Sequence, residues 1–586
     1  MGVRLVWEGK PQQVERLTLP FQTVETINES RATRERDAGS LLQTQGRADA
    51  ARNQLVWGDN KLVMSSLLRE FAGQVKLIYI DPPFDTGADF AYRVSVGDES
   101  VEKLPSILEE HAYRDTWGRG RGSYLSMLYE RLVLMHELLA DDGSLFVHLD
   151  WHQGHYVKVM LDEIFGEGRF LNEIVWWYYN KLQGNINRFA SNHDVLFWYS
   201  KTEKYTFHRL REPRERVKRQ QKRVWDPETK SLKQARDAEG NLVYYDETER
   251  TIDDVWRLPY LMPANRTENV RYETQKPLAV AERVIAASTD EGDLVADFFC
   301  GSGTALVAAE RLGRRWIGCD LGRFAIHTTR KRLLNVPDCR PFDVKNLGAY
   351  ERQRWQIASG NGALRGYLDT ILAFYRAEPV EGFAHLHGRK ANRMVHVGAT
   401  DAPVTIDETE DVMDEMADNG IEACDLLGWE WEMGLHDTIT ERARRRGLDV
   451  RPRQIPREVM ERQVTEADAV RFFELAHVDL DVRRQGKEAC VVLKDFAIPS
   501  ENLIPAKVRE NIQTWSDLID YWSVDFDFSD EVFHNQWQAY RTREQPALAT
   551  QSDWHEYPGP GRYAIVVKII DIFGNDTTKL AEVRIK

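Results

Sequence analysis

Short apolar runs alternate with amphipathic stretches along residues 51–345, and this alternation predicts an α/β domain. Residues 76–80 (KLIYI) and 294–299 (LVADFF) are apolar enough to be buried strands. Residues 125–139 (LSMLYERLVLMHELL) gather their apolar side chains on one face of a helix. Strand–helix–strand order with nearly continuous apolar strands is typical of a parallel sheet covered by helices on both faces.

The rest of the chain divides into three regions with different patterns. Residues 1–50 are polar and weakly patterned, which predicts an N-terminal extension. Residues 346–480 again mix strand and helix patterns, and we interpret them as an α/β region of unknown role. Residues 481–586 alternate apolar and polar positions, as in WSVDFDF and RYAIVVKIIDIF, and predict a β-rich, sandwich-like domain.

Composition and charge narrow the classes of function. The net charge of −15 argues against a general affinity for nucleic acids. The five cysteines are scattered, so we expect neither a disulfide framework nor a metal site. No apolar segment is long enough for a membrane helix and the first residues lack a signal-peptide core, so we expect a cytoplasmic protein without membrane contact.

One basic segment stands out against this acidic background. Residues 204–223 hold nine Lys or Arg and two Glu, within a region at residues 180–262 that interrupts the α/β pattern. The run predicts a surface that contacts nucleic-acid phosphates, and a solvated charged face is the alternative. The candidate contact residues are Arg214, Arg216, Lys218, Arg219, Lys222 and Arg223.

The strand at residues 76–80 ends abruptly. It runs directly into Asp81, Pro82, Pro83 and Phe84. Two prolines remove two backbone donors and fix the backbone direction at the strand end. A plain turn would also use prolines, so the meaning of this motif depends on what accompanies it elsewhere in the chain.

The strand at residues 294–299 leads into a glycine-rich turn. Gly301 and Gly303 precede a predicted helix, and the following strand (RWIGCD) ends on Asp320. Glycines let a backbone approach a ligand closely, and a helix N-terminus offers free N–H groups. An acid about 20 residues further on suits the diol of a ribose. The full dinucleotide motif and the Walker lysine are both missing, so a nucleoside ligand without a pyrophosphate fits best.

The motifs DPPF and FCGSGT together resemble the amino-methyltransferases of DNA, which use S-adenosylmethionine. The order, with DPPF first, resembles the β-class of these enzymes, and TQKP (Thr274–Pro277) resembles a further family motif. The resemblance covers residues 51–345 and implies a Rossmann-like class I methyltransferase fold with permuted motif order. The length and arrangement are similar to the modification subunits of type III restriction systems. This implies duplex DNA as substrate, with a nuclease-helicase restriction subunit and a second copy of the chain as candidate partners.

The resemblance also implies roles for individual residues. Asp81 and the Pro82 carbonyl would accept hydrogen bonds from the target amine, while Phe84 would stack on the flipped base. Pro83 belongs to the same strand end. The residues implied to bind the cofactor are Asp59, Lys276, Asp297, Phe299, Gly301, Gly303 and Asp320. Among these, Asp320 would hold the ribose and Lys276 the cofactor carboxylate, and a helix N-cap is the alternative for Asp59.

Adenine N6 is the target that this sequence favours. Serine commonly replaces the acid of the first motif in the cytosine-N4 branch, so Asp81 favours adenine over cytosine. A cytosine-N4 enzyme, a DNA-specificity subunit of a restriction complex, and a methyltransferase of RNA or small molecules are the alternatives. No pattern in residues 180–262 predicts the recognised base sequence.

Overall fold

The computed structural model describes most of the chain, with gaps, and all structural statements below concern the described residues. These are residues 3–28, 52–83, 92–96, 99–103, 121–181, 187, 189–265, 267–270, 272, 274–348, 350, 352, 364–432, 435–460, 472–498, 509, 512–529, 532–541, 547–572 and 575–586. None of the helices in these ranges is both long and apolar enough to cross a bilayer.

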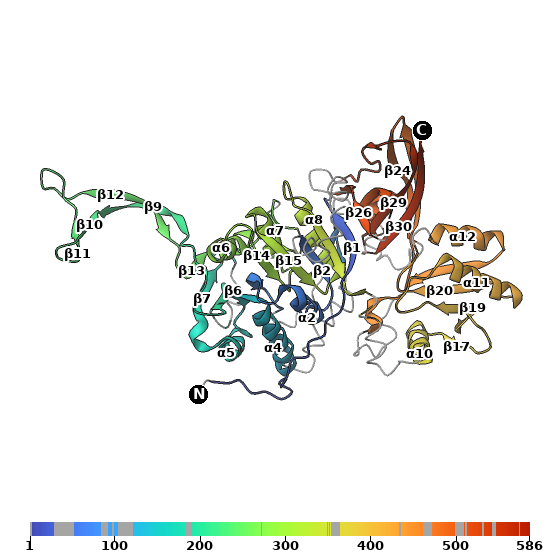
Figure 1. Cartoon of the computed structure of the whole chain (residues 1–586), viewed down its shortest axis with the longest axis horizontal. Helices are drawn as coiled ribbons and strands as arrows, with labels where there is room; N and C mark the ends of the chain where they lie inside the picture. Colours follow the sequence, from blue (N-terminus) through green and yellow to red (C-terminus); the bar gives the residue numbers. More distant parts are fainter. Residues whose placement is uncertain are drawn as a thin grey trace.

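A large mixed sheet forms the centre of the molecule (Figure 1). Its strand order is β13-β7-β8-β6-β3-β14-β15-β2-β16-β1-β26. The strands from β6 to β16 in this order are all parallel to one another. Their bounds are β6 (Leu139–Leu149), β3 (Val75–Ile80), β14 (Leu294–Asp297), β15 (Arg315–Asp320), β2 (Asn53–Trp57) and β16 (Phe342–Asn346). The predicted parallel sheet is therefore confirmed.

Further strands extend this sheet on both sides of its parallel part. On one side lie β8 (His193–Ser200), β7 (Phe170–Trp177) and β13 (Val255–Arg257). On the other side lie β1 (Gln22–Ile27) and β26 (Phe533–Asn535). The last strand comes from the C-terminal part of the chain, so the sheet joins residues from both ends of the sequence.

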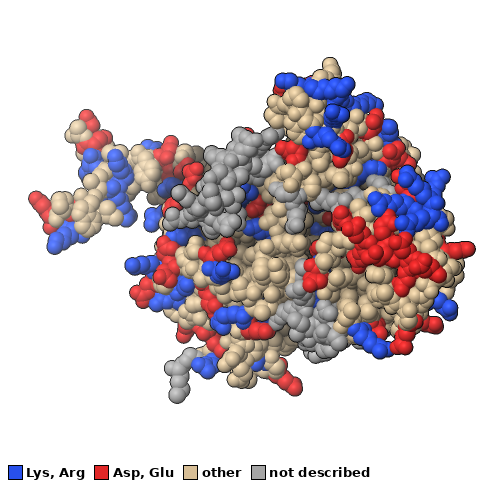
Figure 2. Space-filling model, turned by 45° about the vertical axis from the view of Figure 1, so that its right-hand side comes forward, with Lys and Arg blue, Asp and Glu red and all other residues tan. Residues whose placement is uncertain are grey.

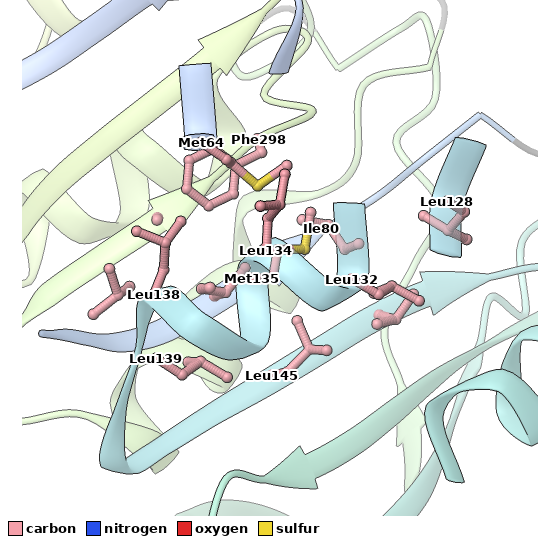
Figure 3. Close-up of a cluster of buried hydrophobic side chains, with 14 of the residues drawn as sticks. Met64, Ile80, Leu128, Leu132, Leu134, Met135, Leu138, Leu139, Leu145 and Phe298 are labelled. Atoms are coloured by element: carbon pink, nitrogen blue, oxygen red, sulfur yellow. The ribbon is translucent and has the colours of Figure 1, made fainter. Parts of the chain in front are cut away.

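Helices cover both faces of the central sheet because its strands are apolar on both sides. One face carries α2 (Asn60–Phe71), α4 (Arg121–Leu138) and α5 (Gly154–Phe165), and the other carries α6 (Leu278–Ser288), α7 (Thr304–Arg311) and α8 (Arg323–Leu334). Strand β3 shows the alternation directly, because Ile78 and Ile80 enter the first core while Leu77 and Tyr79 enter the second. The helix predicted over residues 125–139 is α4, and its leucines pack beside Ile80 and Phe298 (Figure 3).

A separate two-stranded arm projects from this body (Figure 1). Strand β9 (Arg211–Gln221) pairs with β12 (Tyr244–Thr251), and β10 (Arg223–Asp226) pairs with β11 (Ser231–Gln234). The arm, residues 211–251, occupies about half of the region at residues 180–262, and the rest of that region includes β8 and β13 of the central sheet. A further short hairpin is formed by β4 (Tyr92–Val96) and β5 (Glu99–Lys103).

The chain after residue 346 forms two further units. The first is a mixed sheet with α10 (Leu364–Tyr375), α11 (Ile406–Asp418) and α12 (Leu435–Arg445). Its strands are β17 (Glu378–Pro379), β18 (Gly388–Lys390), β19 (Arg393–Val397), β20 (Ala423–Gly428), β21 (Asp449–Gln454) and β22 (Phe473–Glu474), in that order. Strands β19, β20 and β21 are parallel, and separate apolar cores lie beneath α10 and beneath α11 with α12.

The second unit consists of two antiparallel sheets that share one core. One sheet holds β23 (His477–Gln485), β24 (Glu488–Ala497) and β28 (His555–Glu556). The other holds β27 (Trp537–Tyr540), β25 (Ile519–Phe528), β29 (Gly561–Asp571) and β30 (Asp576–Ile585). Both sheets contribute side chains to the same buried cluster, as a sandwich requires.

Strand β1, near the N-terminus, contacts both the central sheet and the C-terminal sandwich. It pairs antiparallel with β16 and parallel with β26. Glu25 of β1 is 2% exposed and lies 2.5 Å from Arg330 of α8 and 3.5 Å from Lys568 of β29. Burial alone would raise the pKa of Glu25, but the charges of Arg330 and Lys568 outweigh it and lower that pKa. Residues 1–50 were expected to be an extension, and the pattern missed β1 because its buried acid is paired with cations from distant segments.

Replacing Glu25 with glutamine should destabilise the protein. At neutral pH it leaves Arg330 and Lys568 buried without their carboxylate, a change that costs about 3–5 kcal/mol for buried pairs. The folded-state pKa lies below the unfolded value of about 4.3, so the carboxylate stabilises the fold above that pH and loses this effect as the pH falls through the folded value. The difference between variant and wild type, measured by urea unfolding, should therefore shrink at acidic pH.

Glu582→Gln is the matched control, because Glu582 pairs with Arg562 on the exposed surface of the same sandwich. Exposed pairs contribute about 0–1 kcal/mol, so this variant should unfold close to the wild type. Equal stability of Glu25→Gln and Glu582→Gln would contradict a stabilising role for the buried cluster.

Candidate functional site

Three acidic side chains from neighbouring strands meet at one edge of the central sheet. Asp81 follows the last residue of β3, Asp297 ends β14 and Asp320 ends β15. These strands are adjacent and parallel, in the order β3-β14-β15. The carboxyl ends of parallel strands open together, so the two predicted motifs lie in one place despite their distance in sequence.

The two carboxylate oxygens of Asp81 have different surroundings. Oδ2 lies 2.5 Å from Nζ of Lys276. Oδ1 is buried and has no hydrogen-bond partner among the described residues. A buried acceptor without a partner is costly for folding, and such atoms are often found where a ligand binds. Asp81 therefore has one oxygen that is held by a cation and one that no described residue contacts through a hydrogen bond.

Lys276 was predicted to meet the cofactor carboxylate, and in the structure its ammonium group pairs with Asp81. Burial lowers the pKa of Lys276, but the nearby carboxylates of Asp81 and Asp194 outweigh this and raise it. The lysine therefore stays charged beside the two acids. The predicted contact with a cofactor carboxylate stays a prediction.

A buried polar chain lies behind this pair, and the sequence motifs did not indicate it. The hydroxyl of Tyr79 lies 3.1 Å from Nδ1 of His148, and Nε2 of His148 lies 3.3 Å from Asp194. Burial raises the pKa of Asp194, but the hydrogen bond and charge of His148 and the charge of Lys276 lower it overall. An acid at the start of the apolar strand HDVLFWYS was the only signal for this group.

Asp297 adds a second buried carboxylate at the same edge. It is 3% exposed, and its Oδ1 accepts a hydrogen bond from the backbone N–H of Phe299 at 3.0 Å. Burial raises the pKa of Asp297 well above its usual value, and the charges of Asp81 and Asp320 raise it further. The charged form of Asp297 is thus disfavoured, and a positively charged ligand beside it would favour that form.

The carboxylate of Asp320 fixes the glycine-rich turn through hydrogen bonds to its backbone. Its Oδ2 accepts from the N–H of Gly301 and its Oδ1 accepts from the N–H of Gly322, both at 2.8 Å. The turn needs glycine at Gly303, where φ is +75° and a Cβ would lie 2.6 Å from Thr329. The proposed contact of Asp320 with a ribose would use the remaining lone pairs of this carboxylate.

Helix α8 clamps the same turn from the other side. The guanidinium of Arg332 donates to the carbonyl of Ser302 at 2.8 Å and to the hydroxyls of Ser302 and Thr304. Thr329 donates to the carbonyl of Gly301 at 2.9 Å. Burial lowers the pKa of Arg332 to about 10. Neither residue belongs to a motif, but both lie in α8, which follows the strand that ends on Asp320.

The remaining predicted site residues have clear local settings. Asp59 is the N-cap of α2, where its Oδ1 accepts from the N–H of Lys61 at 2.7 Å, and Arg131 lies 3.2 Å from the same carboxylate. The structure thus shows the capping role of Asp59 and does not test a cofactor contact. Phe299 is half-buried against the core under α2 and α4. Pro82 is buried, Pro83 is half-buried, and Phe84 lies outside the described residues.

The predicted basic residues lie on the arm, and the partner strand changes their charge balance. Strand β12 places Glu247 opposite Lys218 and Asp246 opposite Arg219. Arg214 is half-buried and pairs with Glu247, so it is less available to a ligand than predicted. The sequence excess of Lys and Arg is therefore partly neutralised by the fold.

Exposed cations and apolar side chains remain side by side on the arm. Arg216, Lys218, Arg219, Lys222 and Arg223 are exposed, and Figure 2 shows Lys and Arg gathered over the middle of the arm. The guanidinium of Arg219 lies 4.7 Å from the ring centre of Tyr244. Large apolar side chains are also exposed here, namely Val217, Val224, Trp225, Leu232, Tyr244 and Tyr245. The arm thus combines cations with surfaces that can contact bases or sugars.

The described residues contain no group of three or more His, Cys, Asp or Glu side chains arranged to hold a metal ion.

Comparisons with known proteins point to one family. A family model described as DNA methylase matches residues 75–331. The chain is 31% identical over 329 residues to the type II methyltransferase M.EcaI of Enterobacter cloacae, which covers 48% of this chain and 69% of that protein. It is 25% identical over 332 residues to the type III restriction-modification enzyme StyLTI Mod subunit of Salmonella typhimurium, covering 45% of this chain and 50% of that subunit.

Among solved structures, the chain is similar to the M1.HpyAVI-SAM complex. The TM-score is 0.30 and the sequence identity is 19%, with 48% of this chain and 99% of that chain covered. The matched family region holds Asp81, Lys276, the glycine-rich turn and Asp320.

Proposed function

This chain belongs to the DNA methylase family, whose members methylate exocyclic amines of bases, and from this premise we propose that it methylates adenine N6 in duplex DNA. The methyl donor in this proposal is S-adenosylmethionine, and the target adenine lies within one short defined sequence. The similarity to M.EcaI and to a type III Mod subunit supports a place in a restriction-modification system. A nuclease-helicase subunit and a second copy of the chain are the proposed partners.

The observation that carries this proposal is the Oδ1 of Asp81 at the sheet edge, which has no hydrogen-bond partner among the described residues. An exocyclic amine is a poor nucleophile because its lone pair is conjugated with the ring. A carboxylate oxygen that accepts one amine hydrogen, and the Pro82 carbonyl that accepts the other, would turn the lone pair out of conjugation. Lys276 holds the other oxygen of Asp81, so that the carboxylate keeps one orientation. The catalytic effect is then mainly one of positioning.

The same edge suits S-adenosylmethionine as the methyl donor. When bound, this cofactor supplies a methyl group activated by a positively charged sulfonium. Asp297 would face its cationic groups, and Asp320 would provide an acceptor for the ribose hydroxyls. The glycine-rich turn, held by Asp320 and Arg332, keeps its backbone close to the ligand. No metal is needed for this transfer.

Adenine is the preferred target for two reasons. A carboxylate such as Asp81 is a stronger acceptor than the serine hydroxyl that commonly stands in the cytosine branch. Phe84 would offer a broad apolar face to a flipped purine, which buries more area than a pyrimidine. Cytosine N4 is the second candidate, because its amine presents the same two hydrogens to the same two acceptors.

Incubation with tritiated S-adenosylmethionine and plasmid DNA tests the proposed reaction. Digestion to nucleosides and mass spectrometry should show N6-methyladenine as the main product. The Asp81→Ala protein serves as the blank. N4-methylcytosine as the main product would overturn the adenine assignment, and label found only in RNA would overturn the substrate class.

Asp81→Ala should abolish methyl transfer and leave S-adenosylmethionine binding nearly intact, because the acid is proposed to face the target amine. Asp320→Ala should instead weaken cofactor binding by about 1–3 kcal/mol, because charge-assisted hydrogen bonds are lost. Calorimetric titration with S-adenosylmethionine and single-turnover methylation separate the two effects. A parallel loss of affinity and rate in Asp81→Ala would argue against its assignment.

Removing the exposed cations of the arm should weaken DNA binding and flatten its salt dependence. We propose the substitution of Arg216, Lys218, Lys222 and Arg223 by glutamine together. Each phosphate contact that is lost removes about 0.9 from the slope of log K against log salt. Fluorescence anisotropy with a labelled duplex at several salt concentrations measures this slope.

A number-matched control removes four cations near α12 instead, namely Arg442, Arg444, Arg445 and Arg446. This variant has the same net charge as the arm variant but should keep the wild-type slope. Equal slopes for the arm variant and the wild type would mean that the arm is a solvated face.

A further inference from the structure

A cavity in the α/β unit at residues 364–474 lies outside the proposed methylation site. Its volume is about 440 Å³, which is within the range of small-ligand sites. Its walls come from the end of α10, the turn between β18 and β19, and the strands β20 and β21. None of the residues that line it belongs to the proposed methyltransferase site, so its occupant is a separate question.

Basic side chains from separate elements converge on this cavity. They are Arg376 after α10, Lys390 and Arg393 at the turn between β18 and β19, and Arg453 on β21. The one acid in the lining is Asp425 of β20, which is 2% exposed. In a protein with a net charge of −15, this concentration of cations is a local exception.

Asp425 positions the side chains of Arg393 and Arg453, but its single negative charge does not neutralise all the cations of the cavity. It lies 2.7 Å from Nε of Arg393 and 3.7 Å from Nε of Arg453, and it accepts from the hydroxyl of Tyr375 at 2.6 Å. Outside the lining, Asp449 pairs with Arg393 and Glu474 pairs with Arg453. These pairs fix the two guanidinium groups in place.

Two hydrogen-bonding groups in the cavity are left over after these pairs. Nε of Arg453 is buried without a hydrogen-bond partner among the described residues. The ammonium of Lys390 lies 3.8 Å from the ring centre of Tyr375, and no carboxylate in the described part of the chain forms an ion pair with it. Burial lowers the pKa of Lys390, and the charges of Arg453 and Arg376 lower it further, while Asp425 acts against them. An anion in the cavity would pair with the ammonium of Lys390.

Fixed guanidinium forks together with an ammonium group are the usual partners of phosphate. The half-buried ring of Phe374 also lines the cavity and offers a face for a planar base. A volume of about 440 Å³ exceeds the needs of a bare phosphate ion. We propose that this cavity binds a nucleotide, with its phosphate against Lys390, Arg376 and Arg453 and its base against Phe374. A free mononucleotide and the 5′-phosphorylated end of a nucleic-acid strand share this chemistry.

Calorimetry on the full-length protein tests the proposal with adenosine monophosphate, adenosine, inorganic phosphate and a 5′-phosphorylated dinucleotide. Saturating S-adenosylhomocysteine is present throughout, so that adenosine groups cannot report on the methylation site. We expect adenosine monophosphate to bind, and adenosine and phosphate each to bind at least about tenfold more weakly. Tighter binding of the dinucleotide would identify a strand end as the ligand, and tighter binding of the monophosphate a free nucleotide.

Variants assign the binding to this cavity. Lys390→Gln should weaken adenosine monophosphate binding by about tenfold or more. Arg389→Gln is the matched control, because Arg389 precedes Lys390 on the same strand, is exposed and does not line the cavity. Phe374→Leu should weaken the binding of the nucleotide but not the binding of inorganic phosphate. This difference separates a loss of stacking from misfolding.

Three results would overturn the proposal. The first is no binding of either nucleotide at about 1 mM. The second is equal binding by Lys390→Gln and wild type, and the third is inorganic phosphate that binds as tightly as the nucleotide. Because the proposal does not rest on methyl transfer, an inactive methyltransferase that still binds nucleotide here would leave it standing.

Discussion

The adjacency of β3 and β14 is the constraint on which the proposed methylation site depends. Val295 and Ala296 pair with Leu77 and Ile78, so the strand that leads to Asp81 and the strand that leads to the glycine-rich turn end side by side. Both strands lie in a parallel sheet that helices cover on both faces. Such strands must be apolar on both sides. The order of the motifs along the chain is therefore unimportant to the site.

The clustered acids at this edge are unfavourable for stability, which fits the binding role proposed for them. Burial disfavours the charged form of Asp297, and the negative charges of Asp81 and Asp320 disfavour it further. Lys276 offsets part of this charge through its contact with Asp81. A fold selected for stability alone would place fewer acids here, and local departures of this kind are expected where a protein binds and positions a ligand.

Local patterns predicted the elements and motifs, while contacts between distant segments escaped them. The apolar alternation predicted β3, β14 and α4, and the glycines predicted the turn before α7. The role of Arg332 could not be predicted, because nothing near it in sequence indicates that its guanidinium reaches Ser302. The pairing of Arg214 with Glu247 also needed the register of β9 and β12, which the basic run does not contain.

Strand β1 has a consequence for how the protein is made. A ribosome releases Glu25 long before it reaches β16, and β26 and Lys568 follow later still. The edge of the central sheet is therefore completed only after β26 has been made, and contacts of such long range form slowly. In the meantime β1 is an unpaired strand that could join to another nascent chain. A charged carboxylate in the middle of the strand opposes such pairing. Glu25 would therefore protect β1 from aggregation during synthesis, before its carboxylate is buried in the folded protein.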